Sequence, residues 1–187
     1  NIYDQFVDQC VDNLSQVRIG HQLDESTQMG PVVNAKQRER VLAYLEKGEA
    51  QGAKCLLKGG PAQVDGHDGH FVKPALLAGS LDNVAAQEEI FGPVAFLAPF
   101  DDERQAIEMA NNTVYGLANS VWTTDLSRAA RVAESMVAGN SWINAHNVFA
   151  HGVPYGGVNQ SGVGGGVLSV ETLMDYYRST SVVRPLG

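Results

Sequence analysis

Hydrophobic and polar residues recur along this chain with two different periods, and these periods predict its elements. Near the start, apolar side chains return at the spacing of one helix face, at Ile2, Phe6, Val7, Cys10, Val11 and Leu14. A second helix is predicted through AKQRERVLAYLEKGEAQG, with Asn34 as its N-cap and Gly52 as its stop. The segments AKCLLKGG and HFVKPALLAG are predicted strands.

From Ile90 onward the pattern becomes a regular alternation. The strand IFGPVAFLAPF is followed by the helix DDERQAIEMANN, the strand YGLANSVWTT, the helix DLSRAARVAESMVA and the strand NSWINA, with Asp101 and Asp125 as expected N-caps. Apolar runs separated by helical segments of roughly a dozen residues are typical of βαβ crossovers. The sequence therefore predicts an α/β fold with a mostly parallel open sheet and flanking helices, and a C-terminal β-strand around Thr180 to Val183.

Composition and charge exclude several classes of function. The 187 residues are 44% hydrophobic, enough to bury a sizeable core. The net charge of -8 and the scattered basic residues argue against nucleic-acid binding, because phosphate contacts need clustered Lys and Arg. No apolar run reaches the roughly 18 residues of a membrane helix, and the start NIYDQFVDQC is not typical of a signal peptide. We expect a cytoplasmic protein without a membrane partner.

The cysteines and histidines do not predict a metal site or a nucleophile. Cys10 lies on the apolar stripe of the first helix and Cys55 in a strand-like run, where a thiol acts as a small hydrophobic side chain. No Cys or His spacing is typical of zinc. For His67 and His70, in DGHDGH, a solvated turn is favoured over a metal site.

Two loops are candidates for binding. The glycine-rich segment HNVFAHGVPYGGVNQSGVGGG follows the last strand of the alternation, but it lacks the spacing of a dinucleotide or phosphate loop. In AAQEEIFGPVAFLAPF, Glu88 and Glu89 directly precede an apolar run. Such a pair is explained by a solvated turn, or by a carboxylate that accepts hydrogen bonds from the vicinal hydroxyls of a ribose. Phe91 then offers a flat face to a ring.

Taken together, four motifs resemble the aldehyde dehydrogenase superfamily. EEIFGPV, NNTVYGLANSVWTTDLSRA, AGNSWIN and PYGGVNQSGVG occur in the family's order, and the similarity extends from Ile2 to about Val183. In that family they belong to the C-terminal portion. The resemblance implies a partial catalytic domain over residues 1–174 and an oligomerisation strand over residues 175–187.

The resemblance also assigns roles to single residues. Glu89 matches the residue that binds the nicotinamide ribose, and Phe91 matches the aromatic residue beside the nicotinamide. Gln37 and Arg40 match positions that contact the adenosine ribose, with Arg40 where Lys is common. The lining of the aldehyde tunnel is matched by Asn147, Phe149 and Tyr155. Glu88 is expected to be a solvated neighbour, and Gly165 and Gly166 replace the family's usual Arg-Glu pair.

The activity implied by the resemblance is NAD- or NADP-dependent oxidation of an aldehyde to a carboxylic acid, through a cysteine thiohemiacetal and thioester. The family's nucleophilic Cys, general-base Glu and oxyanion Asn are expected upstream of Asn1. We therefore predict no catalytic residue in this chain and no activity of the chain alone. The expected partners are a small aldehyde and further copies, as a dimer or tetramer. Two alternatives remain open, a non-catalytic oligomerisation module of the same fold and an acyl-transferring relative.

Overall fold

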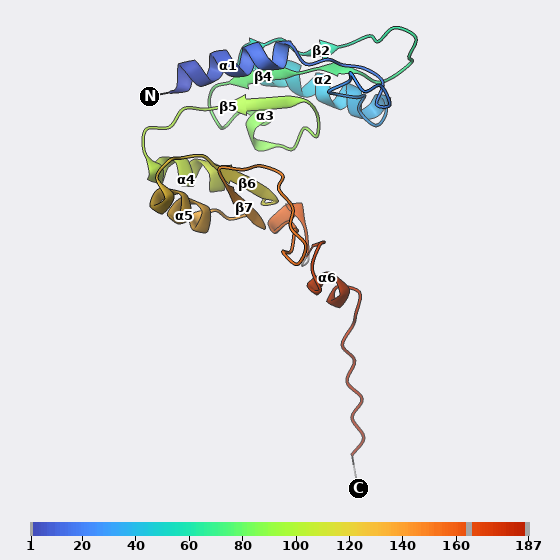
Figure 1. Ribbon diagram of the computed structural model, residues 1–187, viewed down its shortest axis with the longest axis vertical. Helices are drawn as coiled ribbons and strands as arrows, with labels where there is room; N and C mark the ends of the chain where they lie inside the picture. Colours follow the sequence, from blue (N-terminus) through green and yellow to red (C-terminus); the bar gives the residue numbers. More distant parts are fainter. Residues whose placement is uncertain (1, 164–165, 186–187) are drawn as a thin grey trace. The chain divides into compact units, whose positions relative to one another are not determined.

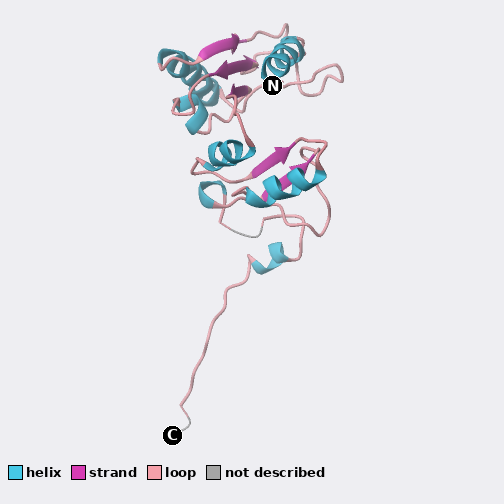
Figure 2. Ribbon diagram, turned by 90° about the vertical axis from the view of Figure 1, so that its left-hand side faces the viewer, coloured by secondary structure: helices cyan, strands magenta, loops and turns pink. Residues whose placement is uncertain are grey.

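The structure, a computed structural model, describes residues 2–163 and 166–185 and divides into two compact units. The first unit ends at Pro99, and the second begins at Phe100. Both units mix helices and strands, which confirms the predicted α/β class (Figures 1 and 2). The predicted division after residue 174 concerns function and stays a prediction.

The first unit is built on a three-stranded sheet. Its elements are α1 (Tyr3–Ser15), α2 (Ala35–Ala50), β1 (Lys54–Leu57), β2 (Gly60–Pro61), β3 (Val72–Lys73), β4 (Ala75–Ala78), α3 (Val84–Gln87) and β5 (Val94–Leu97). The central strand β4 pairs antiparallel with β1 and parallel with β5. Helices α1 and α2 lie on opposite faces of this sheet (Figures 1 and 2). Strands β2 and β3 form a separate antiparallel pair.

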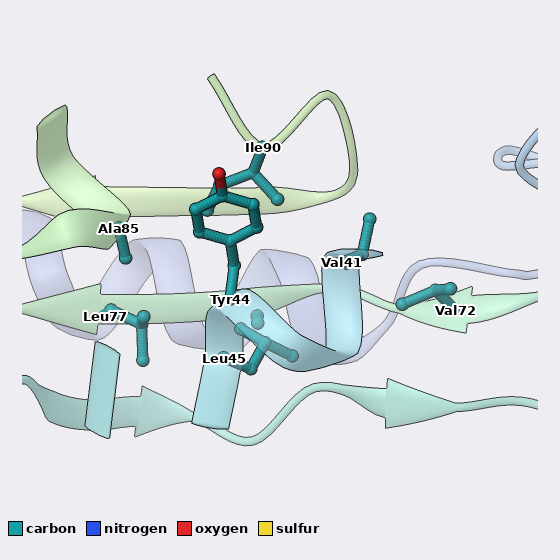
Figure 3. Close-up of a cluster of buried hydrophobic side chains, with 8 residues drawn as sticks. Val41, Tyr44, Leu45, Val72, Leu77, Ala85 and Ile90 are labelled. Atoms are coloured by element: carbon teal, nitrogen blue, oxygen red, sulfur yellow. The ribbon is translucent and has the colours of Figure 1, made fainter. Parts of the chain in front are cut away.

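Helix α2 begins where the sequence predicts and covers one face of the sheet. The side chain of Asn34 accepts a hydrogen bond from the backbone N–H of Gln37 at 2.8 Å, which confirms the predicted N-cap. The buried face of α2 packs over β4, and every residue of β4 is buried (Figure 3). The resulting core cluster consists of Val41, Tyr44, Leu45, Val72, Ala75, Leu77, Ala85 and Ile90.

The second unit contains one of the two predicted βαβ crossovers. Its elements are α4 (Glu103–Asn111), β6 (Ala118–Val121), α5 (Leu126–Ser135), β7 (Asn140–Ile143), η1 (Asn159–Ser161) and α6 (Glu171–Met174). Strands β6 and β7 are parallel, with α5 as their connection, whereas β5 and β6, the strands of the other predicted crossover, belong to different sheets. Asp125 caps α5 as predicted, but α4 is capped by Asp102 instead of Asp101. Neighbouring aspartates carry the same sequence signal, and only Asp102 accepts from the N–H of Gln105.

The predicted mostly parallel sheet is found only in part. Two strand pairs are parallel and two are antiparallel, β1 with β4 and β2 with β3. Between β1 and β4 the chain forms the β2–β3 pair and loops rather than a helix. Residues 58–74 contain no crossover helix of the kind that usually joins parallel neighbours, and β1 and β4 meet antiparallel.

The end of the described chain forms no element of its own. Residues 177–185 are exposed and form no helix or strand among the described residues. An oligomerisation strand pairs with another subunit, so this expectation stays a prediction. Within residues 2–163 and 166–185 no helix is both long and apolar enough to cross a membrane.

Candidate functional site

The loop from Glu88 to Phe91 connects α3 to β5, with Ile90 as its buried residue. The Ile90 side chain is buried in the core of the first unit, whereas Glu89 is exposed and Phe91 is 75% exposed. Phe91 has a φ of 56°, which is uncommon for a residue with a Cβ and marks a constrained backbone. The loop therefore presents a carboxylate and an aromatic ring on either side of a buried anchor.

Helix α2 holds the backbone of this loop through hydrogen bonds. The Nε2 group of Gln37 donates to the carbonyls of Ile90 and Phe91, both at 2.9 Å. An Nη2 group of Arg40 donates to the carbonyl of Glu89 at 2.8 Å. At Gly92, the residue after Phe91, a Cβ would collide with a methyl group of Val41. The backbone therefore packs closely on α2 at this glycine. In the structure the amide of Gln37 and the guanidinium of Arg40 bind the loop itself. Their contacts with the adenosine ribose stay predictions.

The two neighbouring carboxylates differ in their contacts. Glu88 accepts a hydrogen bond from the hydroxyl of Tyr44, a residue of α2 that is 7% exposed. Glu88 is exposed, as expected for a solvated neighbour, but it also accepts this hydrogen bond from the first unit's core helix. Among the described residues, no hydrogen bond or ion pair reaches the carboxylate of Glu89. Glu89 is thus the carboxylate that is free to accept hydrogen bonds from a ligand.

An aromatic cluster in the second unit brings two of the predicted tunnel residues together. Phe149 and Tyr155 meet edge to face, with ring centroids 4.9 Å apart. The ring of Trp142 lies 6.0 Å from Phe149 and 6.1 Å from Tyr155, and His146 lies edge-on to Trp142 at 5.4 Å. We refer to these four rings as the aromatic cluster. The third predicted tunnel residue, Asn147, lies in the same loop with a φ of 54°.

Strand β7 and its partner hold the loop of the aromatic cluster. The indole N–H of Trp142 donates to the carbonyl of Val148 at 2.8 Å, directly before Phe149. The side chain of Asn144 pairs with the backbone N–H and carbonyl of Thr123, both at 2.9 Å. This loop is therefore fixed by the strand that precedes it and by its own rings.

Sequence reasoning missed Tyr44 and Trp142. Tyr44 lies on the same helix face as Arg40, four residues further on, so the helical period could have placed it beside the loop. Trp142 is part of AGNSWIN. Side chains alternate between the two faces of a strand, and this alternation was the signal that could have placed Trp142 on the face toward the loop of Phe149.

The two cysteines differ in their burial. Cys10 is half-buried on α1, whereas Cys55 lies in β1 of the sheet and is exposed, so its small hydrophobic side chain is in the sheet but not in the core. Strand β1 lies at the edge of its sheet, and its first two residues face solvent. Partial removal from water and the Glu49 carboxylate raise the pKa of the Cys55 thiol. Its reactive thiolate form is therefore disfavoured.

The segment DGHDGH turns at residues 65–66 and exposes His67, which agrees with the predicted solvated turn. His67 stacks on His21 with ring centroids 4.5 Å apart, and His70 accepts a backbone hydrogen bond from Val32. Among the described residues, no group of three His, Cys, Asp or Glu side chains comes together as a metal site would require.

Comparisons with known proteins all lead to one family. A profile described as "Aldehyde dehydrogenase family" matches residues 1–182. A betaine aldehyde dehydrogenase from Brucella anthropi is 45% identical over 166 residues, covering 88% of this chain and 34% of that protein. A betaine aldehyde dehydrogenase from Brucella melitensis is 44% identical with the same coverage. The chain spans about a third of the length of the curated relatives it matches.

Two solved structures show the same similarity. Betaine aldehyde dehydrogenase from Staphylococcus aureus, in complex with NAD+, has a TM-score of 0.86 at 33% identity, covering 94% of this chain and 35% of that one. An aldehyde dehydrogenase from Bacillus cereus, an E194S mutant, has a TM-score of 0.87 at 40% identity, covering 94% and 35%.

Proposed function

We propose, from the premise that this chain belongs to the aldehyde dehydrogenase family, that it carries two parts of an aldehyde-oxidising site. The loop of Glu89 and Phe91 anchors the nicotinamide ribose of NAD or NADP. The loop of the aromatic cluster forms one wall of the aldehyde site. The observation that carries the proposal is the exposed Glu89 carboxylate, free of partners among the described residues on a backbone held by α2.

The residues of the first loop fit a bound nicotinamide ribose. An ionised carboxylate only accepts hydrogen bonds, and its two oxygens suit a pair of vicinal hydroxyls. Phe91 is 75% exposed and offers an aromatic face next to this acceptor. The cofactor, when bound, supplies the hydride acceptor for aldehyde oxidation. Glu89 orients the ribose, and Phe91 excludes water from one side of the nicotinamide ring.

The nucleophile of the proposed reaction lies outside this chain. A thiolate must approach the aldehyde carbon, and neither cysteine is suited, since Cys10 is half-buried on a helix and the pKa of Cys55 is raised. This chain binds the nicotinamide ribose and forms one wall of the aldehyde site. A further part of the enzyme supplies the covalent chemistry. We also propose that the enzyme assembles from several copies, with residues 175–187 as a pairing strand.

The substrate that the aromatic cluster favours is an aldehyde with a quaternary ammonium group. Both curated relatives described above are betaine aldehyde dehydrogenases. A cation within about 6 Å of an aromatic centroid gains roughly 0.5–2 kcal/mol, depending on its removal from water. Trp142, Phe149 and Tyr155 place three such rings around one loop.

A charge-matched pair of substrates tests this assignment. Betaine aldehyde is compared with 3,3-dimethylbutanal, a neutral aldehyde of similar branched shape, in the active enzyme that contains this chain. A cation–π preference of about 1–2 kcal/mol predicts a kcat/KM about 5- to 30-fold higher for the cation. Equal values, or a higher value for the neutral aldehyde, would exclude the quaternary ammonium assignment.

A further inference from the structure

Three side chains of α2 contact four consecutive loop residues in reverse order along the chain. Gln37 binds the carbonyls of residues 90 and 91, Arg40 binds the carbonyl of Glu89, and Tyr44 binds the carboxylate of Glu88. The helix positions are spaced by three and four residues, so they lie on one face of α2. The helix thus holds the loop at every residue.

Tyr44 differs from the other two because it belongs to the core. Its ring is 7% exposed and packs in the buried cluster with Val41 and Ile90. Figure 3 shows the ring rising from α2 toward the segment that carries Ile90. The guanidinium of Arg40 lies 4.8 Å from the ring centroid, and the ammonium of Lys47 lies 5.7 Å away. Packing and the two neighbouring cations therefore fix the ring independently of the hydrogen bond between its hydroxyl and Glu88.

The hydrogen bond from Tyr44 determines the direction of the next side chain. A phenol that donates to a carboxylate forms a charge-assisted bond, which is stronger than a bond between neutral groups. Glu88 has extended backbone angles, with φ of -108° and ψ of 148°. In extended backbone, neighbouring side chains point to opposite sides. With Glu88 bound to Tyr44 and Ile90 buried, Glu89 between them faces outward.

We infer that Tyr44 and Glu88 are positioning residues that set the Glu89 carboxylate for the ribose. The inference rests on the proposed function of Glu89. Neither residue touches the cofactor in this assignment, and both act through the loop backbone. The two adjacent carboxylates thus have different roles. Glu88 accepts a hydrogen bond from Tyr44 within the protein, and Glu89 accepts hydrogen bonds from the ligand.

Substitutions that keep the Tyr44 ring or the Glu88 acceptor test this role. Tyr44→Phe removes the hydroxyl but keeps the buried ring. Glu88→Ala removes the acceptor, whereas Glu88→Gln keeps an oxygen that accepts from the phenol. In the active enzyme, Tyr44→Phe and Glu88→Ala should each raise the KM for NAD about 5- to 20-fold, with kcat within about 2-fold. Glu88→Gln should remain within about 3-fold of wild type, because an acceptor is retained.

A double-mutant cycle shows whether the two residues act together. The Tyr44→Phe/Glu88→Ala double variant should raise the KM no further than either single variant, since both remove the same bond. Additive effects, an unchanged KM in both single variants, or a Glu88→Gln effect equal to Glu88→Ala would each overturn the inference. A residue with only a structural role would lower the unfolding midpoint and leave the KM of the folded enzyme unchanged.

A second readout separates this inference from the proposed function. Glu89→Gln should raise the KM for NAD without changing hydrogen exchange of the amides of residues 88–94 in the cofactor-free protein. Tyr44→Phe and Glu88→Ala should accelerate that exchange, and Glu88→Gln should not. If Glu89→Gln leaves the KM unchanged, the ribose-anchor function fails, and the positioning role is then judged by the exchange data alone. Unchanged exchange in Tyr44→Phe would overturn it.

Discussion

The first unit buries a continuous core, whereas the second buries very little. Of the buried hydrophobic side chains among the described residues, only Ala129 and Val132 lie in the second unit. Most of the exposed large apolar side chains among the described residues instead lie in that unit, including Trp122, Phe149 and Tyr176. Exposed apolar surface of this extent is typical of surfaces that other protein covers. The two proposed binding loops therefore have different supports, a helix packed on a core in one unit and a strand with aromatic rings in the other.

The proposal that the nucleophile lies outside this chain concerns both units and gives the largest expected effect. The chain of 187 residues, produced alone, should show no aldehyde-dependent reduction of NAD or NADP, because proximity of a thiolate accounts for about 7–11 kcal/mol of the barrier. The measurement is NADH formation with betaine aldehyde over a no-enzyme control. Turnover that disappears in Cys10→Ser or Cys55→Ser would place the chemistry within this chain.

Because the two units differ in their buried cores, truncating a large apolar side chain to Ala should destabilise the first unit much more than the second. Leu77 on β4 is 0% exposed, so Leu77→Ala should lower the free energy of unfolding by about 2–5 kcal/mol. The matched change Ile143→Ala on β7, at 40% exposure, should cost less than about 1.5 kcal/mol. Denaturant unfolding followed by far-UV circular dichroism checks both. Equal costs would mean that the second unit has its own substantial core.

The division of labour between the loops predicts separable kinetic effects. Phe149→Ala and Tyr155→Ala should change the relative kcat/KM among aldehydes of different bulk by about 1–3 kcal/mol, and the KM for NAD should change less than about 2-fold. Trp122→Phe, at an exposed aromatic residue outside the cluster, is the control. If every aldehyde is affected equally, the aromatic cluster is scaffolding rather than a specificity wall.

A smaller effect comes from charges that link two helices of the second unit. Hydrogen bonding and attraction from Arg131, with a further contribution from Arg128, lower the pKa of Glu103 below 4.5. A lowered carboxylate pKa stabilises the folded state at pH above about 4.5, and this stabilisation is lost as the pH falls through the folded pKa. The pair is exposed, so the effect should be slight.

Tryptophan fluorescence measures this effect in the right place, since Trp122 and Trp142 both lie in the second unit. The unfolding midpoint should fall less steeply with acid in Glu103→Gln than in wild type. Glu134→Gln, which removes a carboxylate from α5 with the same change in net charge, should leave the wild-type slope. Identical slopes in all three proteins would show that the Glu103 pairs add nothing to stability.

The sequence determined the local elements of this protein and the identity of the exposed groups that we propose for binding. The caps at Asn34 and Asp125 and the βαβ alternation depend on neighbouring residues, so their periods and spacings could be read along the chain. Glu89 and Phe91 were found through the resemblance of EEIFGPV, which is a local motif, and the structure leaves both exposed.

Tertiary structure alone decided which groups meet across long separations. Tyr44 and Glu88 are 44 residues apart, and their bond exists because α2 packs on β4 with its apolar face and carries the phenol to the loop. The exposure of Cys55 was likewise fixed by the position of β1 at a sheet edge. Periodicity indicates which face of an element is apolar, but the partner of that face is chosen by the packing of whole elements, since burial is non-directional.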